Sequence, residues 1–357
     1  MPETTVVRPH VKDLVSLRRH LTALATLPVT EAPVISAFFD LRHPVESQRS
    51  SFISWFQAAR ATLNAAQRPH FDSARADVEM ALRQTWPESI NGLAVFVRRG
   101  ETPLLLVLPF AASLEAAFHV ASMPAIFPLV QLKDRFHRFV VAISSEESSR
   151  IFEITLGAVS EQILAVRPEM RQRVGREWTR EHYNQHKREH HRRFIKDQVA
   201  IISSLMKRRG LNHLILAGQP HAVAALRSAL PKDLESRVAD SVLRSPIGQD
   251  CSDVLDEAIS TFIEVEQNES RNTVELLHER VRRNGLAVVG IHACRKAILS
   301  GAASELVISE ELPEADREEL TRLATSSELP VEVCEGDELL ASHGGVGCLL
   351  RYRPHGT

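Results

Sequence analysis

The sequence predicts an α/β protein of two or three domains, and three observations lead to this expectation. At 357 residues, the chain is longer than a single hydrophobic core usually organises. Short apolar runs of strand-like composition alternate along it with amphipathic helical segments. Hydrophobic residues make up 44% and charged residues 25%, as in soluble globular proteins. We therefore expect mixed sheets with covering helices, divided into domains at 1–130, 131–248 and 249–357.

The N-terminal domain is expected to be a sheet accompanied by two helices. Its sequence pattern predicts strands at 34–41, 92–99 and 103–110, and helices at about 52–63 and 71–86. Gly100 lies in the expected hairpin turn between the last two strands. Pro124 and Pro128 indicate a linker to the next domain.

The central domain is expected to begin with a meander of three strands and to continue as a helix–strand–helix unit. The meander is predicted at 138–144, 150–157 and 159–166, with a tight turn at Gly157. After a long helix, the segment HLILAG (213–218) predicts a buried strand and PHAVAALRSAL (220–230) predicts the next helix.

The long helix of this domain, at about 176–209, is the most unusual segment of the chain. Residues 171–210 carry 12 Lys and Arg against four Asp and Glu, whereas the whole chain has a net charge of −2. Its first half has almost no apolar face, and from Phe194 the apolar residues recur at helical spacing: Ile195, Val199, Ile202 and Met206. We expect the second half to pack on a core and the first half to project from it.

The C-terminal domain is expected to be a small, acidic α/β sandwich. Residues 250–340 carry 21 Asp and Glu against eight Lys and Arg. A second long helix is predicted at 253–284, because Arg282 and Arg283 precede Gly285 and form a helix stop signal. The pattern after it predicts a strand, a helix ended by Gly301, a strand, a helix at 313–325, and strands at 331–334 and 346–352. This acidic surface is either simply solvated or a docking face for a basic protein.

A cationic helix on an otherwise acidic protein favours a polyanionic partner, and RNA is the first candidate. Arginine and lysine side chains bind phosphates, histidines add positive charge at low pH, and an aromatic side chain stacks on an unpaired base. The residues expected to bind RNA are Arg173, Arg176, Trp178, Arg180, His182, Tyr183, His186, Lys187, Arg188, Arg192 and Arg193. The alternative is a solvated helix with pairs such as Glu189 and Arg193.

Catalytic and cofactor chemistry is only weakly indicated. His182, His186 and His190 share one helix face, which leaves open a metal-dependent hydrolase or RNase that uses this face with acids such as Asp134, Glu146 or Glu153. The sequence contains no His-Glu-x-x-His motif, and Gly344–Gly347 lacks the Lys and Ser/Thr of a nucleotide-binding loop. We expect no catalytic residues, no bound metal and no cofactor.

The cysteines and the N-terminus give an expectation about location. Cys251, Cys294, Cys334 and Cys348 are far apart and form no Cys-x-x-Cys pair, which favours reduced thiols. The N-terminus has no apolar signal core, and no apolar run is long enough to cross a membrane. We expect a cytoplasmic protein without a membrane partner.

Several segments resemble the class-1 peptide chain release factor and Pelota family of archaea and eukaryotes, and more closely its bacterial relatives. These are KREHHRRFIKDQVAIISSLM, HLILAGQPHAVAALRSAL, GLAVVGIHACRKAILSGAASELVIS and HGGVGCLLRYR, in this order, with VISAFFDL as a weaker match. The resemblance implies a three-domain, release-factor-like architecture with a tRNA-like outline that docks in the ribosomal A site against rRNA.

The sequence departs from the release factors at their catalytic motif. Where they carry Gly-Gly-Gln ahead of the long helix, this chain has RQRVGREW (171–178), with one Gly and no such Gln. The Asn-Ile-Lys-Ser stop-codon motif is also absent from the first domain. Hydrolysis of peptidyl-tRNA is therefore not expected.

The resemblance implies roles that need no hydrolysis. Pelota acts in ribosome rescue, and the bacterial relative Balon acts in hibernation with elongation factor Tu on its third domain. We therefore expect a non-catalytic, ribosome- and RNA-binding translation factor for rescue, hibernation or stress. A protein-interaction scaffold, whose basic helix contacts an acidic protein, is the remaining alternative.

Overall fold

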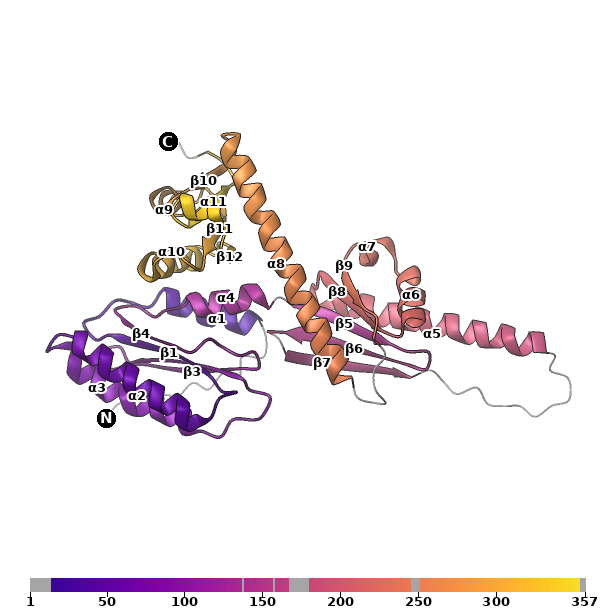
Figure 1. Ribbon diagram of the computed structural model, residues 1–357, viewed down its shortest axis with the longest axis horizontal. Coiled ribbons are helices and arrows are strands. Elements are labelled where there is room, and N and C mark those ends of the chain that lie inside the picture. The colour runs from indigo at the N-terminus through magenta and orange to yellow at the C-terminus, as the bar shows by residue number, and fades with distance from the viewer. Residues whose placement is uncertain (1–13, 137, 157, 167–179, 245–250, 354–357) are drawn as a thin grey trace. The chain divides into compact units, whose positions relative to one another are not determined.

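The computed structural model describes residues 14–136, 138–156, 158–166, 180–244 and 251–353 (Figure 1). The chain forms two compact units. Unit 1 combines Met1–Phe136 with Gln267–Thr357, and unit 2 consists of His137–Glu266. Each unit is described separately below.

The N-terminal part of unit 1 is built on an antiparallel sheet in the order β3-β2-β1-β4. Its strands are β1 (Val34–Asp40), β2 (Gly92–Arg98), β3 (Leu104–Phe110) and β4 (Ala117–Ala121). Strands β1 and β2 are buried along their whole length because helices cover both faces of this sheet, which explains their continuous apolar runs.

Four helices accompany this sheet: α1 (Leu14–Ala25), α2 (Val45–Thr62), α3 (Gln67–Arg83) and α4 (Phe127–Arg135). Helices α2 and α3 pack on the face that carries Ile35, Ala37 and Phe39. The expected linker at Pro124 and Pro128 is wrong at its second proline, because Pro128 lies in the first turn of α4. A proline is tolerated there, since the first N–H groups of a helix have no partner within the helix.

The C-terminal part of unit 1 has a mixed sheet in the order β10-β13-β11-β12. Its strands are β10 (Ala287–Val289), β11 (Ala303–Ser309), β12 (Val331–Cys334) and β13 (Val346–Leu350). The accompanying helices are α9 (Ile291–Leu299), α10 (Glu314–Ser326) and α11 (Glu338–Ser342). Only the β11–β12 pair is parallel, and α10 provides the crossover between these two strands.

Unit 2 has a five-stranded mixed sheet in the order β7-β6-β5-β8-β9. Strands β5 (Phe139–Ser144), β6 (Ser148–Thr155) and β7 (Ala158–Val166) form the predicted meander. Strands β8 (His213–Gly218) and β9 (Val238–Val242) continue the sheet parallel to β5. The helices of this unit are α5 (Arg180–Arg209), α6 (Pro220–Ala229), α7 (Lys232–Glu235) and the first half of α8 (Ser252–Arg282).

Helices cover both faces of this central sheet. Val140, Ala142, Leu214 and Leu216 pack against α5 and α6. The opposite face packs against α8, where the ring of Phe262 stacks on Phe139 with the centroids 3.9 Å apart. The predicted α/β class, with mixed sheets and covering helices, is therefore confirmed. Among the described residues, no helix is both long enough and apolar enough to span a bilayer.

Candidate nucleic-acid interface

The C-terminal half of α5 is fixed to the central sheet by the apolar stripe that the sequence predicts. Ile202, Leu205 and Met206 are at most 1% exposed, and Ile195 is 9% exposed. The buried side chain of Gln198 adds a polar anchor, because its Oε1 accepts a hydrogen bond from the Ser144 hydroxyl at 2.7 Å. This stripe determines which face of α5 is turned away from the sheet.

A buried carboxylate fixes the C-terminal end of α5. Glu153 on β6 is 2% exposed, and its Oε1 lies 2.5 Å from the guanidinium of Arg138, just ahead of β5. Its Oε2 lies 3.4 Å from Nε of Arg209, the last residue of α5. Two guanidinium groups therefore compensate a carboxylate that has been removed from water.

The other face of α5 presents a row of exposed cations. Arg188, Arg192 and Lys196 are exposed and lie four residues apart, which places them on one side of the helix at intervals of about 6 Å. Arg193 is exposed on the neighbouring stripe. Within the described part of the chain, no carboxylate forms an ion pair with any of these four side chains, so their charge remains available to an anionic partner.

The structure describes the predicted RNA-binding residues only in part. Arg173, Arg176 and Trp178 lie outside the described residues. The next group belongs to the first two turns of α5, where the backbone is described but the side chains are not: Arg180, His182, Tyr183, His186 and Lys187. Arg188, Arg192 and Arg193 are the predicted residues whose exposure is established, and Lys196 extends their row by one turn.

The alternative hypothesis of a metal-dependent hydrolase or RNase requires the histidines of α5 and the acids Asp134, Glu146 or Glu153 to lie together. His190 is half-buried, while the side chains of His182 and His186 lie outside the described part. Asp134 belongs to unit 1, whereas Glu146 and Glu153 belong to unit 2. Glu153 pairs in register with Val140 at the start of β5, and Glu146 lies in the turn at the other end of that hairpin. These two acids therefore do not form the carboxylate pair that a nuclease centre requires.

Sequence reasoning missed a polar cluster at the carboxyl ends of the parallel strands β5 and β8. The amide of Gln219 donates to the carbonyl of Ser144 at 3.0 Å, and the Gln219 side chain accepts from the amide of Glu146 at 3.2 Å. The rings of His191 on α5 and His221 on α6 are nearly parallel, with their centroids 6.5 Å apart. Only the crossover from β5 to β8 brings these segments together, so no local pattern could have revealed the cluster.

Comparison with known families gives a match in the central part of the chain. Residues 124–262 match the profile of bacterial archaeo-eukaryotic release factor family 10. The match confirms the resemblance to bacterial relatives of the release factors over these residues. No curated protein sequence matches the chain.

Solved structures of archaeal and yeast proteins are similar at low identity. Ribosome-bound archaeal Pelota, in a structure that also describes ABCE1, is 16% identical, with 99% of this chain and 98% of that chain covered and a TM-score of 0.45. Archaeoglobus fulgidus Pelota is 14% identical, with coverages of 98% and 95% and a TM-score of 0.38. Dom34 of S. cerevisiae is 15% identical, with coverages of 74% and 80% and a TM-score of 0.44.

Proposed function

Because its residues 124–262 are similar to bacterial archaeo-eukaryotic release factor family 10, we propose that this chain is a ribosome-associated, release-factor-like translation factor that contacts RNA through α5. The observation that carries the proposal is the row of exposed cations Arg188, Arg192 and Lys196, none of which is paired with a carboxylate in the described part of the chain.

The chemistry of this row suits a phosphate backbone. Like charges one turn apart destabilise an isolated helix, and the described part of α5 tolerates them because the opposite stripe is packed on the sheet. Each phosphate that such a side chain neutralises releases condensed counterions, so binding weakens as salt rises. The acidic 250–340 region would repel RNA, which leaves the central part of the chain to make the contact.

The proposed role is non-catalytic. Residues 171–178 contain no Gly-Gly-Gln, so the factor would occupy a tRNA-like position in the A site without hydrolysing peptidyl-tRNA. Rescue, hibernation and a stress response are the roles compatible with this property. The domain division at 1–130, 131–248 and 249–357 remains part of the proposal.

A protein partner is proposed for the acidic C-terminal region. Dom34 of S. cerevisiae is described as interacting with Hbs1, and archaeal Pelota is described with ABCE1. By analogy, a translational GTPase such as elongation factor Tu would meet the 249–357 region through a basic patch. This contact would be independent of the RNA contact of α5.

Co-sedimentation with 70S ribosomes tests the RNA contact. The test variant carries Arg188→Glu and Arg192→Glu, and the matched control carries Arg227→Glu and Lys232→Glu, two exposed cations of the same unit. We expect the test variant to bind at least tenfold more weakly than the wild type and the control to bind normally. The slope of log affinity against log salt should become shallower by roughly 1.5 in the test variant, because each of the two lost phosphate contacts contributes about 0.7–0.9 to the slope.

Two results would contradict the proposal. One is a wild-type protein that stays in the top fractions of the gradient even at low salt. The other is an equal loss of binding in both variants, because it would show a dependence on net charge rather than on this helix face.

A further inference from the structure

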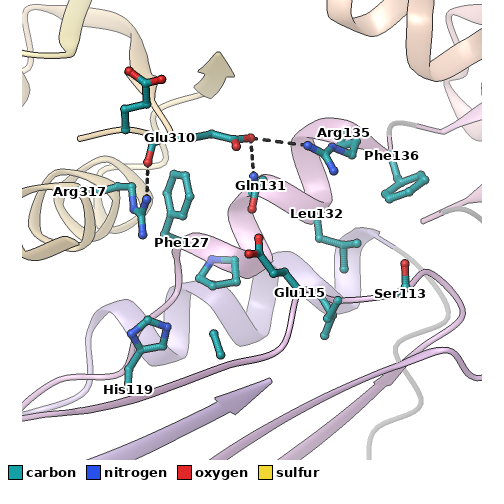
Figure 2. A pocket seen from close by; sticks show the side chains of 14 residues that line it. Ser113, Glu115, His119, Phe127, Gln131, Leu132, Arg135, Phe136, Glu310 and Arg317 are labelled. Carbon is teal, nitrogen blue, oxygen red and sulfur yellow. Dashed lines mark hydrogen bonds and ion pairs between the residues drawn. The ribbon is translucent and has the colours of Figure 1, made fainter. Parts of the chain in front are cut away.

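Unit 1 contains a cavity of ≈ 500 Å³ that plays no part in the proposed RNA contact of α5. Its walls are the segment leading into β4, from Ser113 to His119, the helix α4, and the beginning of α10 with the loop before it (Figure 2). All these residues belong to unit 1.

The cationic side chains of the cavity are already engaged within the protein. The Arg135 guanidinium lies 3.0 Å from Glu335 and 3.6 Å from Glu310. Arg317 donates to the carbonyl of Glu310 and lies over the ring of Phe127, 4.3 Å from its centroid. The imidazole of His119 is paired with Glu314. An anionic ligand would therefore compete with the acceptors that already contact these groups.

The acceptors of the cavity are not all engaged. The amide nitrogen of Gln131 donates to the Glu310 carboxylate, which fixes the orientation of this amide and leaves its oxygen as an acceptor. Figure 2 shows this oxygen and the carboxylate of Glu115 pointing toward one another. Within the described part of the chain, no donor is bonded to either group. Two acceptors that face each other repel unless a donor lies between them.

The spacing of the carboxylates and the apolar wall of the cavity indicate which kind of hydrogen-bond donor would fit between the two acceptors. Among the described residues, the carboxylates of this cavity form no group of three ligand atoms within 4.8 Å of one another, as a single metal ion would require. The wall next to Gln131 contains Leu132 and Phe136, which suit a chain of methylene groups. A donor with several N–H groups on an apolar stem matches both properties.

We propose that this cavity binds an alkylammonium group, either of a free polyamine or at the end of a lysine side chain of a protein partner. The –NH₃⁺ group carries three donors, of which one reaches Glu115 and one reaches the amide oxygen of Gln131. The methylene stem lies along Leu132 and Phe136. The site depends on unit 1 alone and is independent of the proposed RNA contact of α5.

Isothermal titration of the full-length protein at low ionic strength tests this proposal with two probes. The first probe is spermidine, and the second is a capped Gly-Lys-Gly peptide with its Nε-acetylated form as the control. The test variants are Glu115→Gln and Gln131→Met. The matched control is Glu101→Gln, an exposed acid of the same unit outside the cavity. Both test substitutions replace partly or fully exposed side chains, so folding should be preserved.

We expect at least one probe to bind the wild type and the control equally, and to bind each test variant at least fivefold more weakly. Tighter binding of spermidine would identify a free polyamine as the ligand, and tighter binding of the unacetylated peptide would identify a lysine side chain. The proposal is overturned if neither probe binds, which would leave only water between the two acceptors, or if Glu115→Gln and Glu101→Gln behave alike.

Discussion

Glu318 on α10 is a buried carboxylate that connects two distant parts of the sequence within unit 1. Its oxygens accept hydrogen bonds from the backbone N–H groups of Ile126, at 2.8 Å, and Phe127, at 3.1 Å, where α4 begins. A negative charge at this position also complements the positive end of the α4 dipole. Burial raises the pKa of Glu318, and the two backbone hydrogen bonds oppose this shift only in part.

The raised pKa of Glu318 predicts a specific pH dependence of unit 1 stability. A carboxyl group whose pKa is higher in the folded than in the unfolded state contributes stability that is complete below the unfolded value, about 4.3 for Glu, and is lost as pH rises through the folded value. We therefore expect the free energy of unfolding of the wild type, relative to Glu318→Gln, to fall as pH rises from 4 to 7. Urea unfolding in a Trp178→Phe background measures it, because Trp55 and Trp86 then report on unit 1.

The comparison of the wild type with Glu318→Gln at each pH also serves as the control. Groups that do not interact with Glu318 titrate equally in both proteins, so their contributions cancel in the difference. A difference that stays constant over this pH range would show that the hydrogen bonds from Ile126 and Phe127 offset the burial of Glu318 completely.

Helix α5 combines a packed segment and an exposed cationic row in one element. From Phe194 onward, one stripe is buried in the core of unit 2, while Arg188, Arg192 and Lys196 remain exposed. Helix propensity alone does not stabilise such a helix, so its stability must come from the buried stripe. Stability and the proposed RNA contact should therefore be separable by mutation.

Two single substitutions in α5 test this separation. Ile202→Ala removes a side chain that is 0% exposed and should lower the free energy of unfolding of unit 2 by about 2–4 kcal/mol. Arg192→Glu changes an exposed side chain and should alter this free energy by less than about 0.5 kcal/mol while it weakens ribosome binding. Urea unfolding and co-sedimentation measure the two effects. A stability loss in Arg192→Glu as large as that in Ile202→Ala would show that the cationic row has a structural role.

The whole chain passes between its two units twice, after Phe136 and after Glu266. Each unit has its own sheets and apolar clusters, so each has the interior that independent cooperative unfolding requires. We expect scanning calorimetry to resolve two transitions.

Two substitutions assign these transitions. Glu153→Ala leaves the Arg138 guanidinium, whose side chain is 19% exposed, without its carboxylate and should destabilise unit 2 by about 2 kcal/mol. Glu318→Gln removes one acceptor at the start of α4 and should shift only the transition of unit 1. A single transition that moves equally in both variants would instead show that the two units unfold as one.

Sequence patterns predicted the helices and strands that have a strong local periodicity, and they missed several that are short or only half-buried. The predicted helix at 253–284 is observed as Ser252–Arg282, and the strand at 34–41 as Val34–Asp40. Strand β4 was missed because it is short and only half-buried, so it has no continuous apolar run. Helix α1 was missed although Leu14, Leu17, Leu21 and Leu24 recur at helical spacing, a signal that was present in the sequence.

The sequence by itself determined the α/β class, most strands, the two long helices and the cationic character of α5, because periodicity and charge are properties of local segments. Only the tertiary structure decided which cations of α5 are exposed and unpaired, because that depends on how the apolar stripe packs on the sheet. It alone placed Glu318 at the start of α4, and Glu115 opposite Gln131. These groups are distant in sequence or come from different elements, and only the packing of those elements places Glu318 at the start of α4 and Glu115 in one cavity with Gln131.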